Sequence, residues 1–196
     1  SPKDKLEKRT LFFPRYHQLN VVRQLIDHTC NKGVGHTYLI QHSAGSGKSN
    51  SITWAAYQLI EAYPADENLP GARSFEQPLF DSVIVVTDRR ILDKQLRDNI
   101  KEFSEVKNIV APAFKSSELK SALEQGKKII ITTIQKFPFI IDGIDDLSEK
   151  RFAVIIDEAH SSQSGVAADN MNRAMGKDAN DDEGDVQDKI LAAMRS

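Results

Sequence analysis

The sequence predicts an α/β fold in which a mostly parallel sheet is covered by helices on both faces. Short β-branched, apolar runs alternate along the chain with longer amphipathic segments, the pattern of repeated strand–helix–strand units. The runs are apolar throughout, as in the "VIVV" of residues 81–87, which is typical of strands buried on both faces. A length of 196 residues fits a single domain with a sizeable core.

The first half of the chain contains two predicted helices around one predicted strand. Leu19, Val22, Ile26 and Thr29 recur at helical spacing, so the first helix is expected to present one buried face. Glycine and proline mark the helix ends and the following loop. The expected elements are a helix over 15–33, a strand over 37–42, a helix over 48–62 and a loop over 64–78.

The second half repeats the alternation. The expected elements are a strand over 81–87, a helix over 89–103, a short strand over 108–114, a capped helix over 116–126 that ends at a glycine, and strands over 127–133 and 152–160. Residues 176–188 are rich in carboxylates and poor in apolar side chains, which predicts a flexible, solvated acidic loop. Its spacing matches no calcium-binding loop.

Composition narrows the class of protein. The chain is 40% hydrophobic and 28% charged with a net charge of −2, so any contact with nucleic acid has to come from a local patch. Cys30 is the only cysteine, which favours a reducing compartment. Without a membrane-length apolar run or an export signal, we expect a cytoplasmic protein without membrane contact. The start without Met and the end after "KILAAM" suggest a fragment of a larger chain.

The stretch "IQHSAGSGKSNS" over 40–51 has the composition of a phosphate-binding loop between a strand and a helix. The backbone of the loop is expected to approach phosphate oxygens, Lys48 supplies a positive charge, and Ser49 supplies a hydroxyl ligand for Mg²⁺. His42 replaces the first glycine of the usual G-x-x-x-x-G-K-[ST] pattern. The alternative interpretation is a Gly/Ser turn before a helix. The residues expected to bind the nucleotide here are Ala44, Gly45, Ser46, Gly47, Lys48 and Ser49.

A second acidic motif strengthens the first interpretation. Asp157 and Glu158 follow the apolar run "AVII". Since the carboxyl ends of parallel strands meet at one edge of a sheet, this pair and the loop are expected to lie together. Asp157 would hold Mg²⁺ and Glu158 would polarise the attacking water. An acidic pair at the start of a helix is the alternative for "DEAH" alone, but both motifs together predict nucleoside-triphosphate hydrolysis.

The motifs resemble those of the first RecA-like motor domain of superfamily-two helicases and translocases. The resemblance is narrower to the endonuclease (R) subunit of type I restriction enzymes, whose motor motifs are matched in order by "PRYHQ", "HSAGSGKS", "VVTDRRILDKQL", "TTIQKF" and "DEAHSSQSG". It implies a RecA-like P-loop NTPase domain spanning 1–196, with ATP and Mg²⁺ as cofactors.

The resemblance also implies roles for further residues. Gln18 would take the adenine edge, Arg15 would pack on the adenine ring, and His160 would couple the ATP site to another motif. Phosphate contacts with DNA are expected from Arg89, Arg90, Thr133, Gln135 and Lys136. For the arginines, the alternative is a solvated helix face, and for Thr133 and Gln135 it is a strand-end cap.

The implied function is the ATP-binding half of a double-stranded DNA translocase that works with methyltransferase and specificity subunits. In this family a nuclease domain precedes the segment, and a second motor domain with an arginine finger follows it. We therefore expect the 196-residue chain alone to be inactive or very weak. Two alternatives stay open: another DEAH-type helicase motor, and a non-hydrolysing interaction module with a vestigial P-loop.

Overall fold

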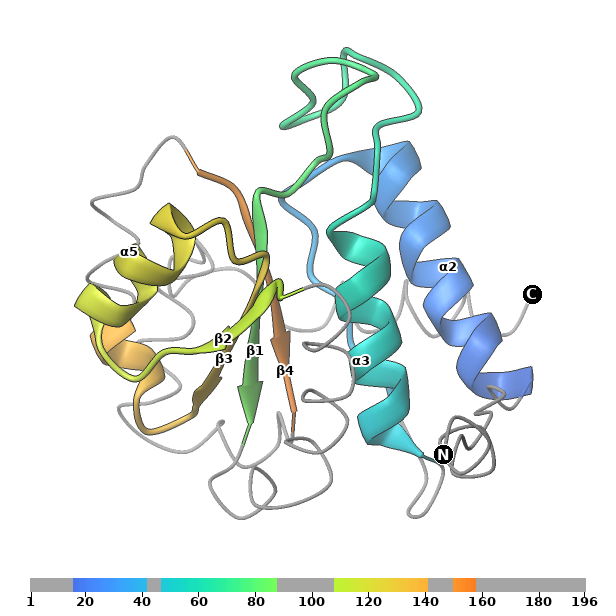
Figure 1. The fold of residues 1–196 in the computed structure, drawn as a ribbon. Coiled ribbons are helices and arrows are strands. Elements are labelled where there is room, and N and C mark those ends of the chain that lie inside the picture. Colours follow the sequence, from blue (N-terminus) through green and yellow to red (C-terminus); the bar gives the residue numbers. More distant parts are fainter. Residues whose placement is uncertain (1–15, 42–46, 88–107, 141–149, 158–196) are drawn as a thin grey trace, which may run out of the picture.

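The structure is a computed structural model that describes residues 16–41, 47–87, 108–140 and 150–157 (Figure 1). The predicted helix over 89–103 and the predicted acidic loop over 176–188 lie outside these ranges. The elements, in chain order, are α2 (Tyr16–Lys32), α3 (Lys48–Leu59), β1 (Ser82–Thr87), β2 (Val110–Pro112), α5 (Ser116–Glu124), β3 (Ile129–Thr133) and β4 (Phe152–Ile156).

The strands form one parallel sheet in the order β2-β3-β1-β4. β1 lies in the middle and pairs with β3 through Val85↔Ile131 and with β4 through Val85↔Ile155. Every pair is parallel, as the unbroken apolar runs predicted. The carboxyl ends of the strands therefore lie together at one edge, at the bottom of Figure 1.

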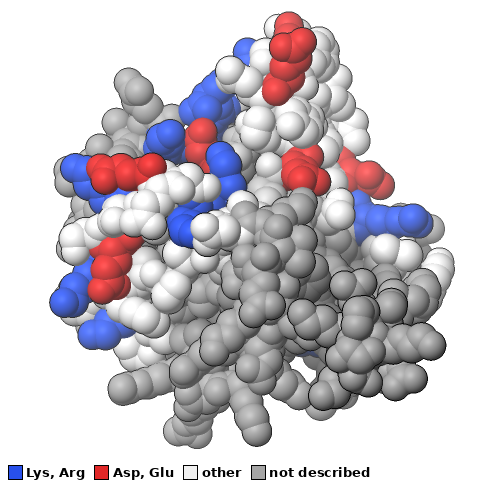
Figure 2. All heavy atoms as spheres, in the orientation of Figure 1, with Lys and Arg blue, Asp and Glu red and all other residues white. Residues whose placement is uncertain are grey.

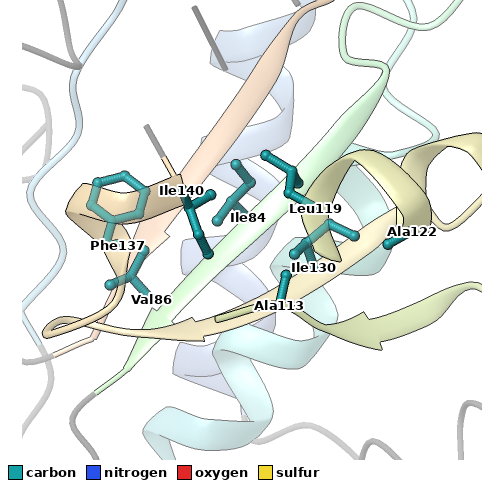
Figure 3. Packing of buried hydrophobic residues seen from close by; sticks show 8 residues of the cluster. All are labelled: Ile84, Val86, Ala113, Leu119, Ala122, Ile130, Phe137 and Ile140. Atoms are coloured by element: carbon teal, nitrogen blue, oxygen red, sulfur yellow. The ribbon is translucent and has the colours of Figure 1, made fainter. Parts of the chain in front are cut away.

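Two apolar clusters pack on opposite faces of the sheet. Alternate residues of a strand point to opposite faces, so Ile84 and Val86 face α5, whereas Val83 and Val85 face α3. The cluster under α5 is shown in Figure 3 and consists of Ile84, Val86, Ala113, Leu119, Ala122, Ile130, Phe137 and Ile140. Truncating a fully buried member such as Ile130 to Ala should cost about 2–5 kcal/mol. Helices on both faces confirm the predicted fold class.

Most predicted elements form close to their expected bounds. Helix α2 ends at Lys32, and the next residue, Gly33, has a left-handed φ of 78°. Residues 64–78 contain no helix or strand, as expected. Helix α5 lacks the predicted side-chain cap: Lys115 is its N-cap residue, and the Glu118 carboxylate instead accepts a hydrogen bond from the Phe114 amide at 2.7 Å. No described helix is long and apolar enough to cross a membrane.

The predicted strand over 37–42 is wrong for its described residues, 37–41, which form no strand. A strand requires a neighbour that shares its ladder hydrogen bonds. Among the described strands, β4 pairs with β1 alone, so this segment has no partner in the sheet. Its apolar side chains are also poorly covered, since Leu39 is 39% exposed and Ile40 is 37% exposed. An apolar pattern alone therefore does not predict a strand, because a strand also needs a neighbouring strand to pair with.

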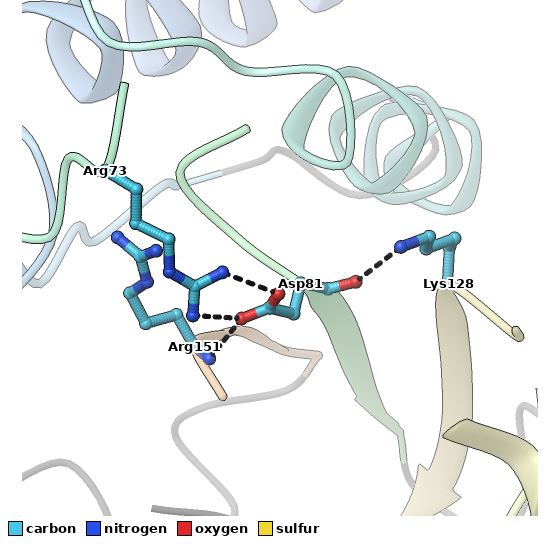
Figure 4. Close-up of polar contacts among 4 residues, drawn as sticks. All are labelled: Arg73, Asp81, Lys128 and Arg151. Carbon is cyan, nitrogen blue, oxygen red and sulfur yellow. Dashed lines mark hydrogen bonds and ion pairs between the residues drawn. The ribbon is translucent and has the colours of Figure 1, made fainter. Parts of the chain in front are cut away.

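The amino end of the sheet is held by a polar network around Asp81 (Figure 4). The Asp81 carboxylate accepts hydrogen bonds from both terminal nitrogens of Arg73, at 3.0 and 3.2 Å, and from the Arg151 amide at 2.8 Å. Burial alone would raise the pKa of Asp81. These hydrogen bonds, with the positive charges of Arg73 and Lys150, outweigh burial and hold the pKa below its ordinary value. The network ties the loop before β1 to the start of β4.

Candidate nucleotide site at the carboxyl end of the sheet

Gly47 is the last residue before α3, at the end of the predicted phosphate loop. Its backbone is left-handed, with φ 79° and ψ 37°, and α3 begins at the next residue. Its carbonyl accepts hydrogen bonds from the amides of Asn50 at 3.1 Å and Ser51 at 3.3 Å, which close the first turn. The amino terminus of a helix offers amide donors and a positive dipole. The start of α3 is thus suited to bind phosphate.

Gln18 of α2 fixes the same glycine from the other side. Its side-chain amide donates a hydrogen bond to the Gly47 carbonyl at 2.9 Å, and the residue is only 3% exposed. A Cβ at position 47 would overlap the Gln18 amide nitrogen, so glycine is required by both space and backbone angle. Sequence reasoning assigned Gln18 to the adenine edge and missed this contact. The adenine contact stays a prediction.

Lys48 and Asp157 form an ion pair between the start of α3 and the end of β4. The Lys48 ammonium lies 2.9 Å from Asp157 Oδ1, and the side chains are 36% and 2% exposed, respectively. The Asp157 amide donates a hydrogen bond to the Val86 carbonyl at 2.8 Å, which extends the β1–β4 ladder and fixes the carboxylate. The two predicted motifs, far apart in sequence, therefore meet in the fold.

Both members of the ion pair could still bind a ligand. Although Oδ1 of Asp157 is close to the ammonium, it accepts no hydrogen bond of regular geometry from the described residues. A fixed carboxylate oxygen is a suitable Mg²⁺ ligand, and a half-exposed lysine can turn to a phosphate. Ser49 lies half-buried in the first turn of α3, and its carbonyl accepts a hydrogen bond from Thr53 Oγ1 at 2.9 Å. The residues present fit Mg²⁺ with a nucleotide.

Further polar side chains lie at the ends of β1 and β3. Thr87 and Thr132 are fully buried, and their hydroxyls have no hydrogen-bond partner within the described ranges. Of the predicted DNA-contacting residues, Gln135 and Lys136 are exposed, whereas Thr133 is buried at 6% exposure. This burial fits the strand-end alternative for Thr133 at least as well as a phosphate contact.

The remaining predicted site residues lie outside the described ranges. They are Arg15, Ala44, Gly45, Ser46, Arg89, Arg90, Glu158 and His160. Their roles stay predictions. The described part of the site consists of Gln18, Gly47, Lys48, Ser49 and Asp157, which come from α2, α3 and the end of β4.

Comparison with known proteins agrees with this geometry. Over 176 residues the chain is 31% identical to the type I restriction enzyme HindI endonuclease subunit of Haemophilus influenzae. It is 30% identical over 156 residues to the SsaAORF53P endonuclease subunit of Staphylococcus saprophyticus. These alignments cover 83% and 77% of the chain but only 15% of each relative. The chain thus spans a small part of the length of these relatives.

A family model gives the assignment. The model of the SWI2/SNF2 ATPase matches residues 17–180, which is more than half of the chain and includes both Lys48 and Asp157. The parallel sheet with helices on both faces is the α/β arrangement expected of a RecA-like domain. The chain belongs to the SWI2/SNF2 ATPase family.

Proposed function

We propose that this chain is the ATP-binding half of the motor of an ATP-dependent double-stranded DNA translocase, within a type I restriction endonuclease subunit. The observation that carries the proposal is the Lys48–Asp157 ion pair, which joins the two nucleotide motifs at the carboxyl end of the sheet. The printed names of the relatives support the restriction context. Methyltransferase and specificity subunits are the proposed partners, and DNA is the proposed track.

The proposed roles divide the site residues into three groups. Lys48 and the start of α3 neutralise the phosphates, and Ser49 and Asp157 hold Mg²⁺. Glu158 orients the attacking water. When bound, Mg·ATP supplies the reactive phosphoryl group. The contribution of the chain is to position it and to stabilise its negative charge.

The chain alone should bind nucleotide weakly and hydrolyse it at a near-background rate. An arginine finger contributes roughly 10³–10⁵ in rate in comparable NTPases, and we infer from the family resemblance that this residue belongs to a second motor domain. Steady-state ATP turnover by the 196-residue chain measures this directly. Turnover as fast as that of the full-length subunit would contradict the half-site proposal.

The central test uses the full-length subunit in its complex. Lys48→Ala should abolish nucleotide binding and DNA-dependent ATP hydrolysis, whereas Glu158→Gln should retain bound ATP without cleaving it. Lys120→Ala, a change at an exposed lysine of α5, is the matched control. If Lys48→Ala bound Mg·ATP as tightly as the parent protein, the module would not be a working P-loop NTPase.

Translocation is tested separately from hydrolysis. Displacement of a triplex-forming strand from duplex DNA, without separation of the duplex strands, is expected of a translocase. Strand separation would instead favour another DEAH-type helicase. Restriction partners are tested by co-purification with the methyltransferase and specificity subunits.

A further inference from the structure

The amino end of the sheet carries a group of basic side chains. They come from the loop before β1 and from the residues directly before β3 and β4, and they are Arg73, Lys127, Lys128, Lys150 and Arg151. Figure 2 shows basic side chains gathered over this end of the sheet, above the middle of the view. Arg73, Lys128 and Lys150 are exposed. We call these five residues the amino-end basic cluster.

Asp81 balances one of these charges, through its ion pair with Arg73 at 3.0 Å. The Lys128 ammonium donates to the backbone carbonyl of Asp81 at 3.4 Å and not to its carboxylate. Lys127 donates to two neutral oxygens of Asn108, at 2.9 and 2.6 Å. Within the described ranges, the four members of the cluster other than Arg73 form no ion pair with a carboxylate. The cluster therefore has an excess of positive charge.

Arg151 shows this excess most clearly. Its Nη2 atom is buried and has no hydrogen-bond partner among the described residues. Its side chain lies beside that of Arg73 (Figure 4). Burial, and then the positive charge of Arg73, lower the pKa of Arg151, and the negative charge of Asp81 opposes them in part. Glu76 and Glu124, which flank the cluster in sequence, are exposed and form no ion pair within the described ranges. A further anion would stabilise this arrangement.

The chain itself contains a segment of opposite charge. Residues 176–188, which lie outside the described ranges, contain six carboxylates and one lysine. Acidic segments of this kind often bind other surfaces. From Asp157 at the end of β4 to position 176 the chain advances by 19 residues, an extended reach of about 60 Å. The five residues of β4 span only about 17 Å, so the segment is long enough to return to the amino end of the sheet.

This segment suits the cluster better than nucleic acid does. The residues expected to contact DNA include Gln135 and Lys136, which follow β3 and so belong to the carboxyl end, opposite the cluster. An uncovered basic cluster at the amino end would attract DNA away from that end. A segment tethered in the same chain is present at an effective concentration in the millimolar range. It therefore occupies the cluster ahead of a free polyanion.

We propose that the acidic segment over 176–188 docks on the amino-end basic cluster, where its carboxylates pair with Lys128, Lys150 and Arg151. The contact goes beyond the proposed function, since it requires neither nucleotide nor DNA. It anchors the chain that follows the DEAH motif at the end of the sheet opposite the nucleotide site, and it covers positive charge that would otherwise bind DNA unproductively. Because the pairs are exposed, each is weak and salt screens them.

The first test is carbodiimide cross-linking of the full-length subunit, which joins lysines to carboxylates in direct contact, with the products identified by mass spectrometry. At about 0.1 M salt, Lys128 and Lys150 should cross-link to residues 176–188 at least about fivefold more than Lys120, an exposed lysine of α5. The yield should fall towards that of Lys120 at about 1 M salt, where the screening length drops from roughly 10 to 3 Å.

Variants test the same contact without removing the reporting lysine. Lys128→Gln should lower the cross-linking of Lys150 to the segment by about two- to fivefold, because an exposed ion pair changes an equilibrium by that factor. Lys120→Gln is the matched control and should leave it unchanged. Asp181→Asn/Asp182→Asn/Glu183→Gln should lower the cross-linking of both lysines to the remaining carboxylates of the segment, and it changes no residue of the described core.

Three results would overturn the inference. The first is cross-linking of Lys128 and Lys150 to the segment at no more than the yield of Lys120. The second is cross-linking of the cluster to carboxylates of another domain or subunit instead, which would make it an interface with that partner. The third is weaker duplex binding by Lys128→Gln/Lys150→Gln, which would make nucleic acid the occupant. ATP hydrolysis enters none of these measurements, so the proposed function stands or fails separately.

Discussion

The amino and carboxyl ends of the sheet differ in how their aspartate carboxylates are bonded, although the amino end also has one buried atom without a hydrogen-bond partner in the described residues, Arg151 Nη2. At the amino end, the Asp81 carboxylate accepts three hydrogen bonds, from Arg73 and from the Arg151 amide. At the carboxyl end, the hydroxyls of Thr87 and Thr132 and Oδ1 of Asp157 accept or donate no regular hydrogen bond within the described ranges. An unpaired buried polar group costs about 1–3 kcal/mol. Such a cost is tolerated where a ligand completes the pairing, and the three such atoms at the carboxyl ends of the strands favour a functional role for that end.

The largest effect is expected from Asp157→Asn. Removing this charge should lower the ATPase activity of the full-length subunit by roughly 10²–10³-fold or more, a loss typical of removing one group that stabilises charge in a transition state. Stability should change little, because the freed Lys48 is 36% exposed and can be solvated. ATPase rates and urea unfolding of the same preparation measure both. If the variant lost stability but kept its ATPase activity, the role of Asp157 at the carboxyl end would be structural and not functional.

Gly47→Ala should have the next largest effect. The substitution forces a left-handed backbone onto alanine and overlaps the Gln18 amide, so it should lower the unfolding free energy by roughly 2–3 kcal/mol and weaken nucleotide binding. Gly126→Ala is the control, since its φ of 78° matches the 79° of Gly47 but nothing lies within 4 Å of the added Cβ. Equal losses in both variants would show that the Gln18 contact is unimportant.

Asp81→Asn should affect stability and spare nucleotide binding. Its cost at pH 7 should be about 1–2 kcal/mol, a modest value because the network is partly exposed. The lowered pKa of Asp81 determines how its contribution to the unfolding free energy depends on pH. This contribution is present above the ordinary aspartate pKa of about 3.9, and it is lost as the pH falls through the pKa that Asp81 has in the folded protein. Urea unfolding from pH 7 down to about pH 2.5 should therefore show the parent and Asp81→Asn converging in acid.

The sequence predicted the sheet more completely than it predicted the network that fixes the site. Apolar runs identified all four strands, and the pattern is strongest for β1 and β3, which are buried along their whole length. The segment 37–41 carried a similar pattern and formed no strand, since a ladder partner is not a local property. Motif logic predicted that Lys48 and Asp157 lie at the same edge of the sheet, but it did not predict the ion pair that they form there. The contact of Gln18 with Gly47 was missed, because a hydrogen bond between distant segments leaves no periodic signal.

The network around Asp81 was missed for the same reason. Arg73 lies in a loop that the composition identified only as irregular, and Arg151 precedes β4. Neither arginine differs in sequence from a solvated surface residue. Spatial proximity alone gives them a structural role, so this kind of interaction requires the fold before it can be recognised.

The smallest effect on the unfolding free energy is expected when a buried threonine is replaced by valine, which has nearly the same shape. This change also tests the comparison of the two ends of the sheet most directly. Thr132→Val removes a hydroxyl that has no partner in the described ranges, and with it the cost of burying that hydroxyl, so the unfolding free energy should rise by about 1 kcal/mol rather than fall. Thr29→Val is the matched change in α2, where Thr29 is 2% exposed and its hydroxyl donates to the Leu25 carbonyl at 2.8 Å. Losing that bond should cost about 1 kcal/mol. Urea unfolding of both variants at one pH measures the difference. A Thr132→Val variant destabilised as much as Thr29→Val would mean that the Thr132 hydroxyl is already satisfied, and that the carboxyl end is built for stability like the amino end.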